Sequence, residues 1–132
     1  MGKPTKEDAA LLIQIFGIES ADEDYKKAVN WFFSEMNETD YNDYKAKNPI
    51  GSEGYQNFMT LCHYWELIGT LVNRDVLNED LVFDMHGDML WDKAEPIIHG
   101  MRKDLDMPRF LENYEVFAKK YPKWAENNPI KV

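Results

Sequence analysis

The segment from Asp84 to Glu95 spaces oxygen-bearing side chains in a way that resembles a calcium-binding loop. Positions 1, 5, 9 and 12 of such a loop supply ligands, and here they are Asp84, Asp88, Asp92 and Glu95. His86 occupies position 3, however, and the glycine required at position 6 is displaced to position 4. These five residues are candidate metal ligands, but the favoured interpretation is that Gly87 ends one helix and the acids begin the next.

Two further pairs of residues suggest a pocket. His63 and Glu66 lie three positions apart, so on a helix they share one face and could act as a metal pair or an acid–base pair. His99 and Arg102 repeat this spacing behind Pro96. Di-metal sites in helical bundles use two Glu-x-x-His motifs, whereas His63 precedes Glu66. We therefore expect a hydrogen-bonded histidine here, and these four residues remain candidates for lining a pocket.

The sequence carries no recognised catalytic signature. It lacks the phosphate-binding, dinucleotide-binding, nucleophile-elbow and His-Glu-x-x-His motifs. Cys62 stands next to His63, but neighbouring residues on a helix point about 100° apart, so they do not form a nucleophile–base pair. We expect Cys62 to be a buried structural residue. The chain is therefore expected to be non-enzymatic and to use no cofactor.

The elements that position these residues are predicted to be helices throughout. Thr5 and Asp8 resemble a capping box that opens a first helix, which Gly17 would end. Ser20 and Glu23 resemble a second capping box. The helix that follows has an apolar stripe at helical spacing: Tyr25, Val29, Phe32, Phe33 and Met36.

A long central helix is predicted near residues 53–74, because apolar residues recur there at helical spacing after the loop-like segment 48–52. Another helix should run over 89–105, with a kink or a break at Pro96, since proline lacks an amide donor. Pro108 suits the first turn of a last helix. We predict an all-α single domain over 1–132, an irregular bundle of five to seven mostly antiparallel helices. Residues 123–132 form a frayed tail unless Trp124 packs back on the body.

Composition limits the partners. Acidic residues outnumber Lys and Arg by 24 to 15, so a formal charge of -9 repels nucleic acids and anionic lipids. The apolar stretch 9–18 is too short for a membrane span. One cysteine allows no internal disulfide, which fits a reducing compartment. We expect a cytoplasmic protein without nucleic-acid or membrane binding. Trp31, Trp65 and Trp91 are expected in the core, and Trp124 at its edge.

The second half of the chain resembles a family of small bacterial helical proteins that is catalogued only as a domain of unknown function. The similar residues lie between about 58 and 121, in the runs Trp65–Val72, Val76–Phe83 and Phe110–Ala118, with Gly87, Trp91, the Pro96–Ile98 run and Arg102 between them. The resemblance implies a helical fold and assigns no activity or catalytic residue.

Three functions agree with these features. The leading hypothesis is a non-enzymatic protein-interaction module of a bacterium or phage, and a homodimer through an apolar helix face is its simplest form. The first alternative is a small-molecule or metal-binding site near Asp84–Arg102. The second is an acidic mimic of nucleic acid, ranked last because the acids alternate with lysines.

Overall fold

The computed structural model describes residues 2–132, and within them every regular element is a helix. The all-α prediction is therefore confirmed. There are eight helices in this part of the chain, and the last two are separated by only two residues, so that they form one bent arm. In chain order they are α1 (Lys6–Ala21), α2 (Glu23–Ser34), α3 (Tyr41–Lys47), α4 (Glu53–Asn73), α5 (Glu79–His86), α6 (Trp91–Asp104), α7 (Glu112–Ala118) and α8 (Tyr121–Asn127).

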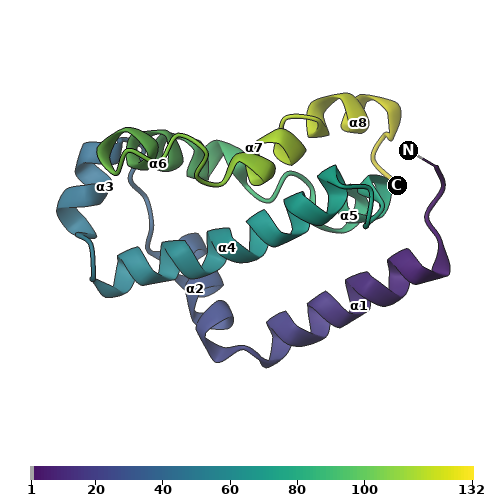
Figure 1. Cartoon of the computed structure of the whole chain (residues 1–132), viewed down its shortest axis with the longest axis horizontal. Coiled ribbons are helices and arrows are strands. Elements are labelled where there is room, and N and C mark those ends of the chain that lie inside the picture. Colours follow the sequence, from purple (N-terminus) through teal and green to yellow (C-terminus); the bar gives the residue numbers. More distant parts are fainter. Residues whose placement is uncertain (1) are drawn as a thin grey trace.

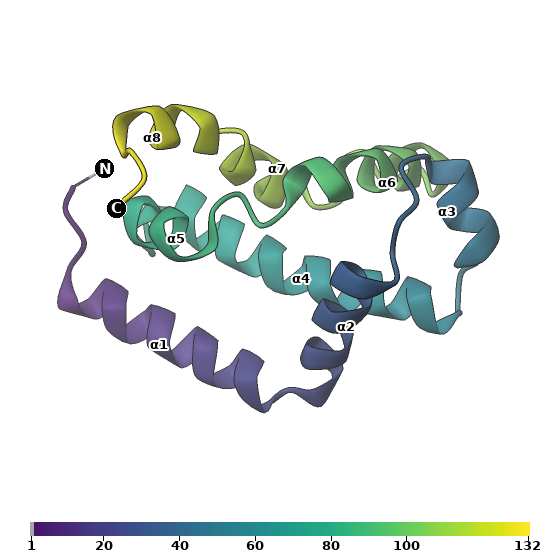
Figure 2. The same ribbon diagram turned by 180° about the vertical axis from the view of Figure 1, so that it is seen from behind.

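The predicted central helix is α4, and the other helices surround it (Figure 1). Helices α6, α7 and α8 follow one another along one side of α4, while α1 runs on the opposite side (Figures 1 and 2). The most extensive contacts of α4 are with α7 and α2. Gly69 lies at the α4–α7 contact, where a Cβ atom would stand 2.6 Å from the carbonyl oxygen of Asn113. A glycine at this position allows the two backbones to approach closely.

Aromatic side chains form much of the core. Phe32, Phe58, Tyr114 and Phe117 are fully buried, and the ring of Trp65 contacts both Phe32 and Tyr114. Trp31, Trp65 and Trp91 are buried as predicted, whereas Trp124 is only partly buried. The sulfur of Cys62 is a buried free thiol, in agreement with a structural role.

The first two helices differ from the sequence-based expectation. Helix α1 continues through Gly17 to Ala21, and Asp22 rather than Ser20 caps α2. The Asp22 carboxylate accepts hydrogen bonds from the backbone N–H groups of Asp24 and Tyr25. Gly17 does not end the helix because a glycine within a helix lowers its stability only moderately, and Asp22 is as good an N-cap as Ser20.

The C-terminal half contains two helices whose first residues could not be predicted from the sequence. Helix α6 continues past Pro96 without a break, and its N-cap Leu90 has a left-handed backbone with φ 57°. Helix α7 begins at Glu112 instead of near Pro108, after Leu111, which also has φ 57°. Neither leucine caps its helix through a side chain. Tertiary contacts therefore set both starts.

The segment expected to fray includes α8. The Trp124 ring stacks on Tyr121 and packs against Phe83 of α5, and its indole N–H donates to Asp80 at 2.8 Å. Trp124 thus packs back on the rest of the protein. This contact is the condition under which the segment was not expected to fray. Residues 128–132 are exposed and lie outside any helix. None of the helices in residues 2–132 is long and apolar enough to cross a membrane.

Candidate binding face of α1 and α2

The five residues of the calcium-like segment have separate roles. Asp84 pairs with Lys131 at 2.5 Å, and Asp88 accepts a hydrogen bond from the N–H of Leu90 at 3.1 Å. Asp92 is an exposed acid in the first turn of α6. His86 ends α5 and faces α1, and Glu95 approaches His99. Within residues 2–132, no three of these five side chains bring their ligand atoms together.

Glu66 is used for structure. Its Oε1 accepts a hydrogen bond from the N–H of Tyr114 at 2.8 Å, and its Oε2 accepts one from the side chain of Asn113 at 3.0 Å. Both of its oxygens are thus directed to the first turn of α7. His63 is exposed on α4. These contacts give both oxygens of the Glu66 carboxylate a partner on α7, so this side chain joins α4 to α7.

A second cluster joins α6 to α7. Potential ligand atoms of Glu95, His99 and Glu115 lie within 4.8 Å of one another. Two cations already bind Glu115, because Arg102 Nη1 lies 2.6 Å from its Oε1 and Lys119 Nζ lies 2.5 Å from its Oε2. Burial raises the pKa of Glu115, but these two hydrogen bonds outweigh it and lower the pKa to about 2. The cluster is a compact ion-pair network that joins the two helices.

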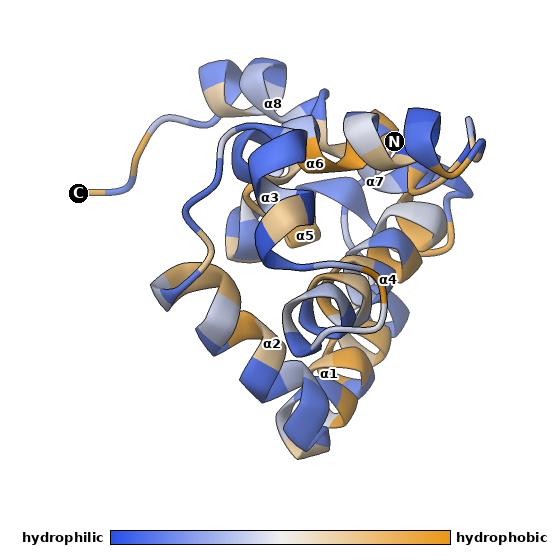
Figure 3. Ribbon diagram, turned by 90° about the vertical axis from the view of Figure 1, so that its left-hand side faces the viewer, coloured by the Kyte–Doolittle hydropathy of each residue, from blue (hydrophilic) through white to orange (hydrophobic). Residues whose placement is uncertain are grey.

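Helix α1 is apolar on more than one side. Its buried side carries Leu12, Ile15 and Glu19. An outer stripe of Ala9, Ile13 and Phe16 has the helical spacing i, i+4, i+7 and flanks the buried side. Ile13 is 70% exposed and Phe16 is 52% exposed. Figure 3 shows hydrophobic residues in α1 as well as in the central helix α4.

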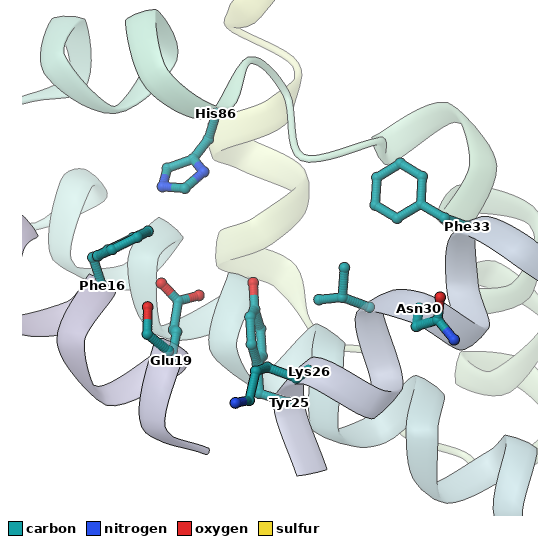
Figure 4. Close-up of a pocket in the computed structure, with 9 residues that line it drawn as sticks. Phe16, Glu19, Tyr25, Lys26, Asn30, Phe33 and His86 are labelled. Carbon is teal, nitrogen blue, oxygen red and sulfur yellow. The ribbon is translucent and has the colours of Figure 1, made fainter. Parts of the chain in front are cut away.

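A pocket of about 460 Å³ opens where α1, α2 and α5 meet. Phe16, Glu19 and Ser20 of α1 form one wall, the α2 residues Tyr25, Lys26, Val29, Asn30 and Phe33 form another, and His86 of α5 closes one end. Figure 4 shows Glu19 and His86 at one end and Phe33 at the other. Phe33 is 62% exposed, so this member of the apolar stripe of α2 faces the pocket and the solvent.

Glu19 is the unusual residue of the pocket. It is only 5% exposed, and its Oε2 has no hydrogen-bond partner among the described residues. Burial raises the pKa of Glu19, and a hydrogen bond with the Tyr25 hydroxyl opposes this only in part. Burial also lowers the pKa of His86 and so favours its neutral imidazole. The pocket therefore combines a buried acid, a neutral imidazole and apolar walls.

His86 of this pocket was predicted from the sequence as a candidate metal ligand. Glu19 was not predicted, although one signal for it was present. Leu12, Ile15 and Glu19 have the spacing i, i+3, i+7, so an acid stands where the buried stripe of α1 calls for an apolar residue. The other expected site residues, His63, Glu66, His99 and Arg102, do not line this pocket.

The fold and this face define an all-α protein with an apolar pocket that contains a buried carboxylate. The chain belongs to the family described as "Domain of unknown function (DUF4760)", whose pattern matches residues 4–124. The match extends the expected resemblance, which began near residue 58, to include α1 and α2. No curated protein and no solved structure matches the chain.

Proposed function

We propose that this chain is a non-enzymatic protein-interaction module and that the outer stripe of α1 is its contact surface. The single observation that carries the proposal is the exposure of Ile13 and Phe16 on a helix that is also buried along another side. A helix with apolar residues all round normally lies inside a larger structure. Here the rest of the chain covers only the side of Leu12 and Ile15.

The partner that fits this stripe best is a second copy of the chain. Residues 9–18 contain no charged side chain, whereas the chain as a whole carries a formal charge of -9. Two copies repel each other at most other faces, and this uncharged helix is a surface on which they can meet. The stripe itself offers no charge that would select a basic or an acidic partner.

An antiparallel arrangement of two α1 helices suits their dipoles. Lys6, Glu7 and Asp8 give the N-terminal end of α1 no net positive side-chain charge, so attraction between the ends comes from the helix dipoles. Antiparallel pairing around a two-fold axis places the positive dipole end of each helix beside the negative dipole end of the other. A helix of this length buries less than a standard interface, so we expect a reversible dimer with a dissociation constant near the micromolar range.

Sedimentation velocity over a concentration series from about 5 to 500 µM tests the proposal. We expect a monomer–dimer equilibrium that Ile13→Glu shifts fully to the monomer, because two carboxylates would meet at the contact. Ile50→Glu is the matched control, since Ile50 is 64% exposed but lies in the connection before α4. A wild-type chain that remains monomeric, or an Ile13→Glu variant that still dimerises, contradicts the proposal.

The cellular setting is part of the same proposal. The free buried thiol of Cys62 supports a reducing compartment, so we place the module in the cytoplasm. The resemblance in the sequence supports a bacterial or phage origin. Two acids support the non-enzymatic assignment, Glu66 of α4 and Glu115 of α7. The oxygens of both side chains already bind backbone or side-chain donors.

A further inference from the structure

We propose that the pocket between α1, α2 and α5 binds an organic ammonium ion with an apolar body, and that Glu19 is the residue that recognises the ammonium group. The inference concerns the pocket side of α1 and does not depend on dimerisation: the pocket shares Phe16 with the outer stripe, but Ile13 does not line it. It rests on the placement of four groups: the Glu19 carboxylate, the His86 imidazole, the ring of Phe16 and the apolar wall at Val29 and Phe33.

The carboxylate is the first argument. A buried polar atom without a partner lowers stability, and such atoms are uncommon in native proteins. Oε2 of Glu19 is one of them, on a residue that is 95% buried at the edge of an open pocket. Natural sequences break the local packing rule mainly where a function requires it. A ligand that donates to Oε2 would satisfy this atom.

The neighbouring groups show why the donor should be a cation. Tyr25 already contacts the Glu19 carboxylate, and Lys26, the cation of the pocket wall, pairs with Glu23 at 2.9 Å. No cation among the residues of this pocket therefore neutralises Glu19. The ring of Phe16 borders the same end of the pocket (Figure 4), and aromatic faces attract ammonium groups.

His86 supplies a second acceptor. Its imidazole lies across the pocket from Glu19 (Figure 4). A neutral imidazole has one nitrogen that accepts a hydrogen bond, whereas an imidazolium has none. Burial lowers the pKa of His86 and keeps the ring neutral near pH 7. An ammonium group between Glu19 and His86 could thus donate to both, while an anion would meet the repulsion of the carboxylate.

The rest of the pocket selects the body of the ligand. Val29 and Phe33 belong to the α2 wall of the pocket. Phe33 lies at the end away from Glu19, with Asn30 beside it (Figure 4). A volume of about 460 Å³ lies within the range of small-molecule sites. The shape favours an elongated molecule with the amine at one end and an alkyl or aryl group at the other.

Three probes of equal length test the inference by calorimetric or NMR titration: 4-phenylbutylamine, its alcohol 4-phenylbutan-1-ol, and the anion 4-phenylbutyrate. We expect the amine to bind most tightly, the alcohol more weakly and the anion weakest. Glu19→Gln keeps the shape and removes the charge, so it should weaken amine binding by about 10- to 100-fold and leave the alcohol nearly unchanged. Glu7→Gln, an exposed acid on the same helix, is the matched control.

A second measurement uses the wild-type protein and so does not depend on whether the variants fold. In the wild-type protein, the amine should shift the carboxylate ¹³C resonance of Glu19 and the ring resonances of His86. Equal affinity for amine and anion, unchanged amine affinity in Glu19→Gln, or the absence of these shifts at millimolar amine overturns the inference. The same titration of the Ile13→Glu variant separates it from the dimer proposal, because loss of dimerisation should leave amine binding intact.

Discussion

Glu66 of α4 caps a helix to which it does not belong: its carboxylate accepts the N–H of Tyr114, which lies 48 residues further along the chain. The helix it caps, α7, has no side-chain cap of its own. The same carboxylate accepts a hydrogen bond from the side chain of Asn113. One acid therefore fixes both the start of α7 and its position on α4.

We expect Glu66→Ala to lower the free energy of unfolding by about 1–3 kcal/mol, because it leaves the Tyr114 N–H without its partner. Urea denaturation followed by circular dichroism measures the change. His63→Ala on the same helix is the control, since His63 is exposed and its removal should change stability by less than about 0.5 kcal/mol. Equal stability of the two variants would show that the cap contributes little.

Gly69→Ala should destabilise the α4–α7 contact. The new Cβ would stand 2.6 Å from the Asn113 carbonyl oxygen, a backbone atom that cannot move without shifting α7. We expect a loss of about 1–3 kcal/mol, although alanine favours the helix more than glycine does. Gly17→Ala, where no atom lies within 4 Å of the added group, should instead stabilise α1 by up to about 1 kcal/mol.

Both glycine variants are best compared by urea denaturation in the Ile13→Glu chain, so that self-association does not contribute to the result. Opposite signs for the two substitutions support the close backbone approach at Gly69. If both variants gain stability, the α4–α7 contact has room for a methyl group.

Much of this architecture could be predicted, and the reasons are local. Thr5 caps the first helix through its own side chain, as its spacing from Asp8 predicts. The helix α4 could be predicted because its apolar residues recur at helical spacing within one continuous segment. The start of α7 could not be predicted, because its cap is Glu66, a residue distant in sequence. Sequence spacing also suggested a shared site for His63 and Glu66, but a distant backbone amide takes up the Glu66 carboxylate.

The binding face also combines features that the sequence predicts with features that depend on the tertiary structure. The apolar residues of α1 and α2 are visible in the sequence, but periodicity does not say which of them other helices will cover. Phe33 follows Phe32 on α2, and only Phe32 is buried. Glu19 could have been found as an acid on a buried stripe. That its Oε2 has no partner depends on the arrangement of Tyr25 and Lys26 around it.

Glu19 should make the stability of the protein depend on pH. Its pKa is raised in the folded state, chiefly by burial, so folding favours the protonated form. The stability that this form provides is present below the unfolded pKa and is lost as pH rises through the folded pKa. Tyr25 and Lys26 of α2 and His86 of α5 are the other titratable groups at this pocket.

Glu19→Gln is therefore expected to raise the free energy of unfolding at pH 7 by up to about 1 kcal/mol relative to the wild type, with the gain shrinking toward pH 4. Urea titrations at four pH values between 4 and 7 measure the difference. Glu7→Gln should show no comparable pH-dependent gain. A Glu19→Gln variant that is less stable at pH 7 would indicate that the carboxylate stabilises the fold.

The C-terminal arm provides a truncation test. Ending the chain at residue 127 removes exposed residues, the Lys131–Asp84 ion pair and the hydrogen bonds of Asn128 at the end of α8, so stability should change by about 1 kcal/mol or less. Ending it at residue 122 also removes Trp124, whose ring packs on Phe83, and we expect a loss of about 1–3 kcal/mol. Thermal unfolding of both chains checks this. Equal melting temperatures would mean that the tryptophan contact is energetically unimportant.

The left-handed leucines at the starts of α6 and α7 also bear on how the protein is made. A branched side chain at positive φ costs about 1 kcal/mol or more, so neither Leu90 nor Leu111 adopts this conformation before tertiary contacts impose it. The two helices are thus poor nuclei for folding. During synthesis α4 leaves the ribosome long before α7. The apolar surface of α4 that α7 covers therefore stays exposed until α7 is made, whereas α2, which precedes α4, is already present for its own contact. The growing chain is most prone to aggregate in that interval.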